Sequence, residues 1–381
     1  MRVTLVISAL VAGGAQRVMT NMANYWASRG WTITLLTLAD GETEPFFELD
    51  PRARHIPLGV EGDSPHVVVG VWNNLKRVCA LRKAIRESCP EVVISFIDQV
   101  NVLTLLATFG LGFKVVVSER IDPNVYRLGK VWERLRWWVY SGADRIVLQT
   151  QGALAYFLPK FQGHAVVIPN PVFVPKTEQG DGGADVRSTG PLIIAAGRLA
   201  EQKHFDLLLR AFARLKDQYP EWTLTILGEG PMRPVLESLL VQLGLTDRVF
   251  LPGFVKNPHD FLRRASLFVM TSLFEGFPNS LCEAMACGLP VISTECTDGL
   301  REIIRDGQDC IIVPPDNEEA LVSAMARLMG NEAERQRLAR RAVEIADRFS
   351  FGKVMEMWEE VLNGVAGKPR TVPVGQEAAG T

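Results

Sequence analysis

The chain has 381 residues, of which 47% are hydrophobic, and its formal net charge is −2. This length suits two domains with buried cores, and the near-neutral charge gives no global field for nucleic acid, so we expect no nucleic-acid partner. The charge is uneven, because residues 1–170 carry 18 basic and 14 acidic side chains. That excess suits an anionic surface or substrate, and it also suits an ordinary solvated face.

Cysteine usage and apolar segments limit the class of protein further. The six cysteines show no CxxC spacing and no histidine nearby, which argues against zinc and favours reduced thiols in a cytoplasmic protein. The apolar run at residues 2–10 is short and leads into an amphipathic stretch, so it predicts a core strand better than a signal peptide. No uninterrupted apolar segment reaches membrane length.

The first 37 residues predict a strand, a glycine turn, a helix and a second strand. Residues 2–10 are almost continuously apolar, residues 13–17 read Gly-Gly-Ala-Gln-Arg, and the helix stops at Gly30 before the strand at 32–37. This is a Rossmann-like unit, and its glycines allow the backbone to approach a phosphate. The turn lacks a complete GxGxxG, so a dinucleotide site is not predicted.

The same alternation of strands and helices continues to residue 168 and restarts at residue 192. Further strands are predicted at 54–57, 91–96, 114–118, 144–149, 165–168, 192–196, 222–227, 249–251, 265–270, 291–293 and 311–313. Helices are predicted at 73–88, 101–109, 131–141, 152–161, 205–219, 233–243, 258–265, 318–329, 332–349 and 354–362. Such alternation predicts an α/β protein with two parallel sheets.

The composition also predicts where the domains end. We expect an N-terminal Rossmann-like domain over 1–172, a linker over 173–190, a C-terminal Rossmann-like domain over 191–350, a final helix over 351–366 that packs back on the N-terminal domain, and a disordered tail over 367–381. A ligand of such a pair binds at the carboxyl ends of the strands.

One stretch has the composition of a phosphate cradle. A strand ending at residue 270 is followed by a Gly/Pro loop with Glu275 and then by a short helix. Backbone N–H groups at a helix start favour an anion, and a carboxylate in the loop can bind sugar hydroxyls. Ser280 and Glu283 also have the spacing of a capping box, so Glu283 has a structural alternative.

Two other strand ends carry cations. Arg198 and Lys203 lie five residues apart in a strand-to-helix loop and could neutralise a leaving diphosphate without a metal ion. Arg120 follows Ser118 and Glu119 at a strand end that faces the predicted crevice. The alternative for each is a solvated loop charge or an exposed Glu–Arg pair.

Aromatic and basic residues interleave between residues 126 and 140. Such a mixture is typical of a membrane-interface surface, and the basic helix predicted at 73–88 adds to it. The alternative is a core helix with a basic edge. The candidates for contact with membrane or acceptor are Arg17, Tyr126, Arg127, Trp132, Arg134, Arg136 and Trp137.

In their order and spacing these motifs resemble those of retaining glycosyltransferases of family 4, whose GT-B fold has two Rossmann-like domains facing across a cleft. The similarity covers residues 2–365 and favours the subgroup that builds lipopolysaccharide, capsule or lipid-linked oligosaccharides. It rests on residues 13–17, Gly197, Arg198, Lys203, Gly228, Glu229, Gly230, Glu275 and Glu283.

The resemblance implies a role for each motif. Arg198 and Lys203 would hold the diphosphate of a UDP-sugar, and Glu275 would contact the donor sugar; with Arg120 they are the expected catalytic residues. Glu283 would bind the ribose. The remaining expected donor-binding residues are Gly13, Gly14, Gly230, Arg233, Phe254, Val255, Phe277, Pro278, Asn279, Ser280 and Leu281. The family uses no metal and no cofactor besides the donor substrate.

Arg120 departs from the family, many of whose members have histidine there. A guanidinium cannot serve as a neutral base, so Arg120 would hold a donor or acceptor phosphate. This leaves a mechanism in which the leaving phosphate oxygen accepts the acceptor's proton on the same face of the sugar.

We therefore expect a metal-independent retaining glycosyltransferase, cytoplasmic and peripheral to the inner membrane. It would move a hexose or N-acetylhexosamine from a UDP-sugar to a glycan on a polyprenyl diphosphate, with an anionic membrane surface as partner. Alternatives are a soluble or protein acceptor, a nucleotide-sugar epimerase, a sugar phosphorylase, or an inactive sugar- or lipid-binding subunit.

Overall fold

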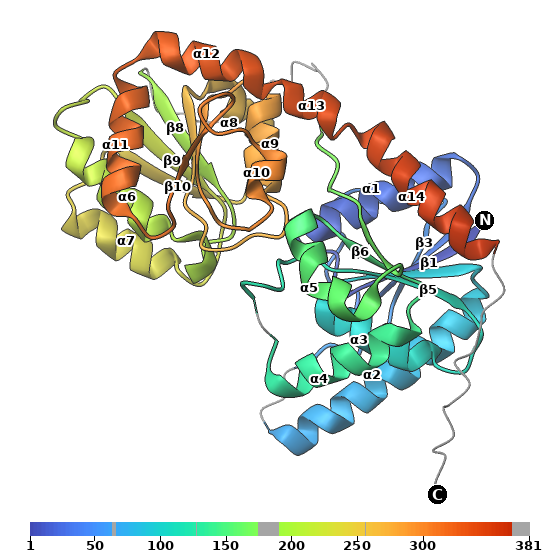
Figure 1. Cartoon of the computed structure of the whole chain (residues 1–381). Coiled ribbons are helices and arrows are strands. Elements are labelled where there is room, and N and C mark those ends of the chain that lie inside the picture. Colours follow the sequence, from blue (N-terminus) through green and yellow to red (C-terminus); the bar gives the residue numbers. More distant parts are fainter. Residues whose placement is uncertain (63–65, 127, 174–189, 256, 368–381) are drawn as a thin grey trace, which may run out of the picture.

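The computed structural model describes residues 1–62, 66–126, 128–173, 190–255 and 257–367. The predicted linker and the predicted disordered tail lie almost entirely outside these residues. Two parallel α/β sheets form the described molecule, each covered by helices on both faces, as Figure 1 shows. The predicted fold class is confirmed.

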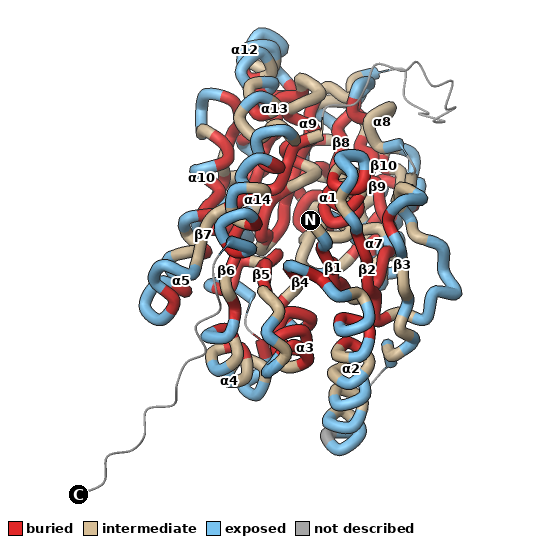
Figure 2. The backbone as a smooth tube through the Cα atoms, turned by 90° about the vertical axis from the view of Figure 1, so that its right-hand side faces the viewer, coloured by how far each residue is buried: buried red, intermediate tan, exposed pale blue. Residues whose placement is uncertain are grey.

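The first sheet has seven parallel strands in the order β3-β2-β1-β4-β5-β6-β7. Its strands are β1 (Arg2–Ile7), β2 (Thr32–Thr37), β3 (Arg54–Pro57), β4 (Val92–Phe96), β5 (Lys114–Ser118), β6 (Arg145–Leu148) and β7 (Ala165–Val167). The central strands β4 and β5 are rich in Val and Ile, and all of their residues except Lys114 are buried, because helices cover both of their faces (Figure 2).

The helices of the first sheet divide between its two faces because side chains alternate along each strand. They are α1 (Gly14–Ser28), α2 (Val67–Ser88), α3 (Asp98–Thr108), α4 (Lys130–Val139), the 3₁₀ turn η1 (Tyr140–Gly142) and α5 (Gln151–Phe161). Val3, Leu5 and Ile7 pack with α1 on one face. On the other face Val6 packs with α2, α3 and α5.

The second sheet has six strands in the order β10-β9-β8-β11-β12-β13. They are β8 (Leu192–Ala196), β9 (Thr223–Leu227), β10 (Val249–Gly253), β11 (Leu267–Met270), β12 (Val291–Thr294) and β13 (Ile311–Val313). Its helices are η2 (Glu201–Lys203), α6 (Phe205–Leu215), α7 (Arg233–Gln242), α8 (Pro258–Arg264), α9 (Asn279–Ala286), α10 (Leu300–Ile303), α11 (Glu318–Met329), α12 (Glu332–Ala342) and α13 (Glu344–Arg348).

The last helix, α14 (Phe351–Ala366), returns to the first sheet after the second is complete (Figure 1). Its apolar stripe, which includes Trp358 and Leu362, is buried in the core beside α1. The Trp358 and Phe96 rings lie 6.1 Å apart. The chain therefore crosses between the two sheets twice, which ties the two halves together.

Several elements differ from the sequence predictions, among them α6, which ends at Leu215 instead of residue 219. Helix α2 begins at Val67 instead of residue 73, because propagation adds one hydrogen bond per residue once the helix has nucleated, which outweighs the modest helix propensity of valine. The helix predicted over 332–349 is divided into α12 and α13 at Val343, and the short α10 was not predicted. None of the described helices is both long and apolar enough to cross a membrane.

Candidate functional site

The starts of α1 and α9 meet where the two halves of the molecule face each other. A Cβ atom on Gly14, the first residue of α1, would lie 2.4 Å from the side-chain nitrogen of Asn279, the first residue of α9. Only a glycine permits this approach. Both helix starts carry partial positive charge, so their meeting point favours an anion.

The Glu283 side chain forms an ion pair across the same interface. Arg17 Nη1 donates to Glu283 Oε1 at 2.5 Å, and the guanidinium also lies 5.0 Å from the Phe173 ring centre. Burial raises the pKa of Glu283, and Arg17 partly offsets that rise. The alternative of a capping box with Ser280 is wrong, because α9 starts at Asn279 with Pro278 as its N-cap and has no side-chain cap.

Lys203 and Glu275 come together from the loops that follow the neighbouring strands β8 and β11. The Lys203 ammonium donates to a Glu275 carboxylate oxygen, and both side chains are largely buried. Gly197 allows this, because it has φ +156° and a Cβ there would lie 2.8 Å from Lys203 Cε. Glu275, which lacked a structural alternative in the sequence, therefore has one: it neutralises Lys203.

Arg198 remains a free cation among the described residues, because its exposed side chain has no ion pair or hydrogen bond there. The glycines of residues 228–230 pack directly on its loop. A Cβ on Gly230 would lie 2.4 Å from the carbonyl oxygen of Leu199. The two loops thus form one rigid wall beside Lys203, with Arg198 pointing into solvent.

The residues expected near the nucleotide base lie along β10 and α7. Arg233 is held by both Glu229 oxygens at 2.6 and 2.7 Å, so its charge is already neutralised. Phe254 is exposed, and its ring lies 6.2 Å from that of Phe46 in the N-terminal half. Val255 packs partly against the core.

In the loop between β11 and α9, which contains Glu275, and in the first turn of α9, side chains and backbone groups face different directions. Phe277 and Leu281 are buried in the core of the C-terminal half, so only their backbone groups are available to a ligand. Asn279 and Ser280 are half-buried. Gly276 lies against the first half, since a Cβ there would be 2.3 Å from the carbonyl oxygen of Arg120.

Arg120 is buried and has no acidic partner among the residues that the structure describes. Its guanidinium carbon lies 3.4 Å from the centre of the Phe96 ring, and its Nη1 donates to Asn170 Oδ1 at 2.6 Å. Burial lowers the pKa of Arg120, but a guanidinium starts so far above neutrality that it stays protonated at pH 7. The contact of Arg120 with a phosphate stays a prediction, and in this structure Phe96 and Asn170 hold its buried side chain.

A charged cluster behind Arg120 corrects part of the membrane prediction. Arg136 is 1% exposed, pairs with Glu133 at 2.7 Å and lies 3.9 Å from buried Glu119. The Tyr140 hydroxyl donates to Glu119, and burial raises the pKa of that carboxyl to about 7. Arg136 cannot face a membrane, because α4 turns it inward.

The other candidates for contact with membrane or acceptor in this region differ in whether they are buried or exposed. Trp137 stacks on Phe161 with ring centres 5.5 Å apart, and Trp132 packs against the same core, so both stabilise the fold. Tyr126 lies 5.8 Å from Phe274 of the C-terminal half. Arg134 is exposed, and Arg127 lies outside the described residues.

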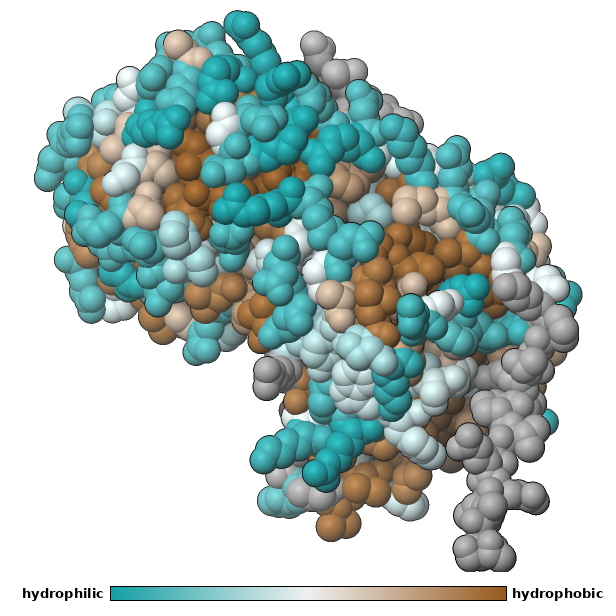
Figure 3. All heavy atoms as spheres, in the orientation of Figure 1, coloured by the Kyte–Doolittle hydropathy of each residue, from teal (hydrophilic) through white to brown (hydrophobic). Residues whose placement is uncertain are grey.

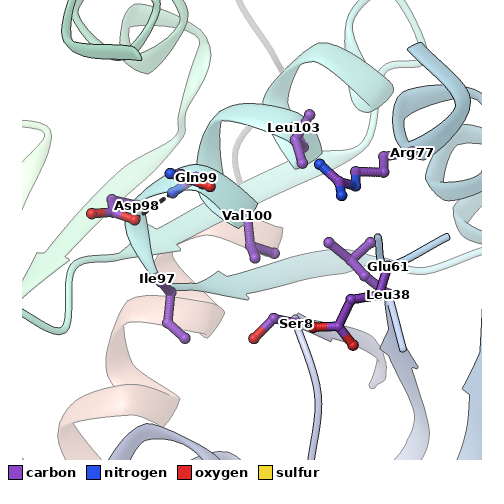
Figure 4. A pocket seen from close by; sticks show the side chains of 9 residues that line it. All are labelled: Ser8, Leu38, Glu61, Arg77, Ile97, Asp98, Gln99, Val100 and Leu103. Atoms are coloured by element: carbon purple, nitrogen blue, oxygen red, sulfur yellow. Dashed lines mark hydrogen bonds between the residues drawn. The ribbon is translucent and has the colours of Figure 1, made fainter. Parts of the chain in front are cut away.

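A cavity of about 250 Å³ opens at the carboxyl edge of the first sheet (Figure 4). Ser8, Leu38 and Ile97 line it and directly follow β1, β2 and β4. Ile97 has φ +77°, a strained conformation for a β-branched residue.

Other polar groups around this cavity are Glu61, Arg77, Asp98 and Gln99. Burial raises the pKa of Asp98. These residues were not predicted from the sequence; the signal that was available is a buried strand, 92–96, followed after Ile97 by Asp98 and Gln99.

Family models match both halves of the chain. A "Glycosyl transferase 4-like domain" matches residues 13–171 and "Glycosyl transferases group 1" matches residues 183–344. A Campylobacter jejuni enzyme is 26% identical over 363 residues, covering 95% of this chain and 98% of its own. It is named as an alpha-1,4-N-acetyl-D-galactosaminyltransferase acting on a diNAcBac-PP-undecaprenol glycan.

Solved structures share the architecture over the whole length. Sucrose-phosphate synthase from Thermosynechococcus elongatus superposes with a TM-score of 0.81 at 20% identity, covering 95% of this chain and 98% of its own. Anabaena HepE in complex with UDP-glucose has a TM-score of 0.80 at 19% identity, covering 96% and 100%. With two matching domain models and this shared fold, the chain belongs to the family-4-type glycosyltransferases of the GT-B fold.

Proposed function

We propose that this enzyme moves a hexose or N-acetylhexosamine from a UDP-sugar, with retention of configuration and without a metal ion, to a glycan carried on a polyprenyl diphosphate. The observation that carries the proposal is the meeting of the glycine-lined start of α1 with the start of α9, just after the loop in which Glu275 pairs with Lys203. Relatives named for undecaprenyl-diphosphate glycans support the acceptor, and HepE bound to UDP-glucose supports the donor.

Arg198 and Lys203 supply the charge that the leaving diphosphate needs. Arg198 has no partner among the described residues, and Lys203 can exchange its bond with Glu275 for a phosphate oxygen. Charge-assisted hydrogen bonds of this kind are strong in a site that excludes water. The released Glu275 carboxylate would then accept from the donor sugar's hydroxyls.

Transfer with retention follows from attack on the face that the diphosphate leaves. The bond from the anomeric carbon to the phosphate oxygen breaks, and the bond to the acceptor oxygen forms on the same face. The acceptor's proton passes to the leaving phosphate oxygen. This sequence needs no enzyme nucleophile, so Glu275 remains available to accept from the donor sugar's hydroxyls.

The cavity of Figure 4 suits the terminal sugar of the acceptor. Asp98, Gln99 and Ser8 offer a carboxylate, an amide and a hydroxyl for sugar hydroxyls. The carboxylates of Asp98 and Glu61 would repel a phosphate there, so the lipid diphosphate would lie outside the cavity. In this proposal a neutral sugar of the acceptor binds at the carboxyl edge of the first sheet.

The end of the molecule formed by α2 and α4 suits an anionic bilayer. Trp72 and Val131 expose 59% and 70% of their surface, and the exposed cations Lys76 and Arg134 lie on the same two helices. Figure 3 shows apolar groups beside hydrophilic ones at this end. Aromatic and basic groups together favour a membrane interface.

Nucleotide release from a panel of UDP- and GDP-sugars, with a polyprenyl-diphosphate glycan as acceptor, tests the reaction. We expect Lys203→Ala and Glu275→Gln to lower turnover at least a hundredfold, since each removes charge from the leaving group or the sugar. Arg340→Ala, on the exposed face of α12, is the matched control. Full transfer by both site variants would contradict the assignment.

Flotation with vesicles of anionic or zwitterionic lipid tests the membrane surface. The double charge reversal Lys76→Glu and Arg134→Glu should abolish binding to anionic vesicles, because each reversed charge costs about 1 kcal/mol or more near such a surface. Arg340→Glu with Lys353→Glu makes the same change of net charge elsewhere and should leave binding intact. Equal loss of vesicle binding in both double variants would contradict the proposed membrane-binding surface.

A further inference from the structure

A buried chain of hydrogen bonds crosses from the first half of the molecule to the start of α9. Arg120 Nη1 donates to Asn170 Oδ1 at 2.6 Å, and Asn170 Nδ2 donates to Asn279 Oδ1 at 3.0 Å. Arg120 follows β5 and Asn170 follows β7, whereas Asn279 begins α9. The three side chains can therefore connect only when the two halves are closed on each other.

The guanidinium fixes the direction of every bond in this chain. Arginine has donors only, so Asn170 must turn its oxygen toward Arg120 and its NH₂ toward Asn279. Asn279 must then accept through its own oxygen, which leaves its NH₂ facing the glycine turn. That nitrogen lies 2.4 Å from where a Cβ on Gly14 would be.

Arg120 is poorly satisfied in its own surroundings. It is 9% exposed, and within the part of the chain that the structure describes no carboxylate pairs with it. Its Nε and Nη2 are buried and have no hydrogen-bond partner among the described residues. A carboxylate at position 170 would satisfy this buried cation better than an amide does, but it could not donate to Asn279.

We propose that Arg120 is a positioning residue that acts through Asn170 to hold the Asn279 side-chain NH₂ toward the donor's diphosphate. This inference rests on the proposed function, in which the diphosphate binds beside the point where Gly14 meets the start of α9. The amide at position 170 lowers stability around Arg120 and in return keeps a hydrogen-bond donor aimed into the cleft. Donor binding and closure of the two halves then favour each other, because the chain of bonds exists only in the closed form.

The variant Asn170→Asp distinguishes the proposed positioning role of Arg120 and Asn170 from a role in stability alone. The introduced carboxylate gives Arg120 a counter-ion, so thermal stability should be unchanged or higher. Asn279 must then turn over to donate to that carboxylate, which points its oxygen at the diphosphate. We expect UDP to bind at least about tenfold more weakly by calorimetry, the effect of losing one charge-assisted hydrogen bond.

The proposed action of Arg120 through Asn170 on Asn279 is called the relay below. A double-mutant cycle with Asn279→Ala distinguishes this relay from electrostatic repulsion of UDP by the new carboxylate. In the Asn279→Ala background, Asn170→Asp should weaken UDP binding by less than about twofold, because the group it turns is gone. A loss that persists in that background, or a fall in the melting temperature of Asn170→Asp, would overturn the relay. Arg120→Lys, which keeps a cationic donor, should retain more UDP affinity than Arg120→Met, and equal loss in both would also overturn it.

The wild-type measurement separates the two proposals. Equal binding of UDP to the wild type and to Asn170→Asp would overturn the relay alone. If the wild-type chain bound neither UDP nor GDP, the proposed donor class would fall and the relay with it.

Discussion

At the scale of single residues, Gly14 shows how one missing side chain lets the starts of α1 and α9 approach each other closely. The predicted role of this glycine followed from its turn, but the atom it spares, the Asn279 amide, became visible only in the folded chain. Asn279 cannot easily yield, because Asn170 holds its oxygen at 3.0 Å.

Gly14→Ala should therefore weaken UDP binding about tenfold or more while the free energy of unfolding changes by less than about 1 kcal/mol. The added methyl displaces Asn279 in the closed form, whereas alanine at a helix start is intrinsically favourable. Calorimetry and thermal unfolding measure the two effects. Gly13→Ala should lose less affinity, because its methyl would meet only the mobile Gln16 side chain. The opposite ranking would contradict the geometry.

Glu119 gives the protein a pH dependence of stability. Burial raises the pKa of this carboxyl from an ordinary 4.5 to about 7, so the folded state binds its proton more tightly than the unfolded state does. The stabilisation is complete below pH 4.5 and is lost as the pH rises through 7.

Glu119→Gln should flatten that dependence. Between pH 5 and pH 8 the wild type should lose about 2.5 kcal/mol more than the variant, in line with the rise of this pKa from 4.5 to about 7. Thermal unfolding across this range is the measurement, and Glu295→Gln at an exposed ion pair is the control. Parallel curves for wild type and Glu119→Gln would rule out the shift.

At the scale of elements, α14 holds the N-terminal half from outside its own sequence. Trp358 is 1% exposed and packs on Phe96. The Phe96 ring also contacts the Arg120 guanidinium. Sequence periodicity predicted a helix here, and the core of the first sheet supplies the partner for its apolar stripe.

Trp358→Ala should destabilise the protein by about 3–5 kcal/mol, because a large cavity opens in the core. Met357→Ala, at a neighbouring residue that is 37% exposed, should cost less than about 1 kcal/mol. Denaturant unfolding monitored by tryptophan fluorescence compares the two. Similar midpoints would mean that α14 contributes little to the fold.

Helix α4 shows where pattern reading fails. Its mixture of aromatic and basic residues fits both a membrane surface and a core helix, since both patterns have the same period. The tertiary structure assigns each residue to one side: Arg136 and Trp137 face the core, and Arg134 and Trp138 face solvent.

At the scale of the whole molecule, polar contacts hold the two halves closed. The Glu302 carboxylate accepts from the backbone N–H groups of Gln151 and Gly152 at 2.9 and 3.2 Å. Thr297 Oγ1 donates to Asp122 Oδ2 at 2.6 Å. These contacts between the two halves are few and polar, so we expect the closure of the halves to be reversible.

Glu302→Ala should shift the molecule toward an open form in the absence of nucleotide. A carboxylate at a helix start contributes about 1 kcal/mol, so the open fraction should rise roughly fivefold. Small-angle scattering should show a larger radius of gyration, which saturating UDP restores. Glu295→Ala, which breaks an ion pair within the C-terminal half, is the matched control. An unchanged radius for Glu302→Ala would show that other contacts keep the halves closed.

The sequence by itself determined the α/β alternation, the two parallel sheets and the glycine loops at strand ends, because these depend on local periodicity and on backbone freedom. The sequence also identified charged groups at the carboxyl edges of the sheets, namely Glu275, Glu283, Arg198 and Lys203. It did not predict which of these side chains pair with which others. Arg17 and Glu283 are 266 residues apart, and no local pattern says that they touch.

Only the tertiary structure decided which side of α4 is buried and what Arg120 contacts. A charge at a strand end can face solvent or turn under the sheet, and the choice depends on the space left by Phe96, Asn170 and a helix from the far end of the chain. Local sequence determines which groups are available at an edge. Long-range packing determines which of them reach a ligand and which hold the others in place.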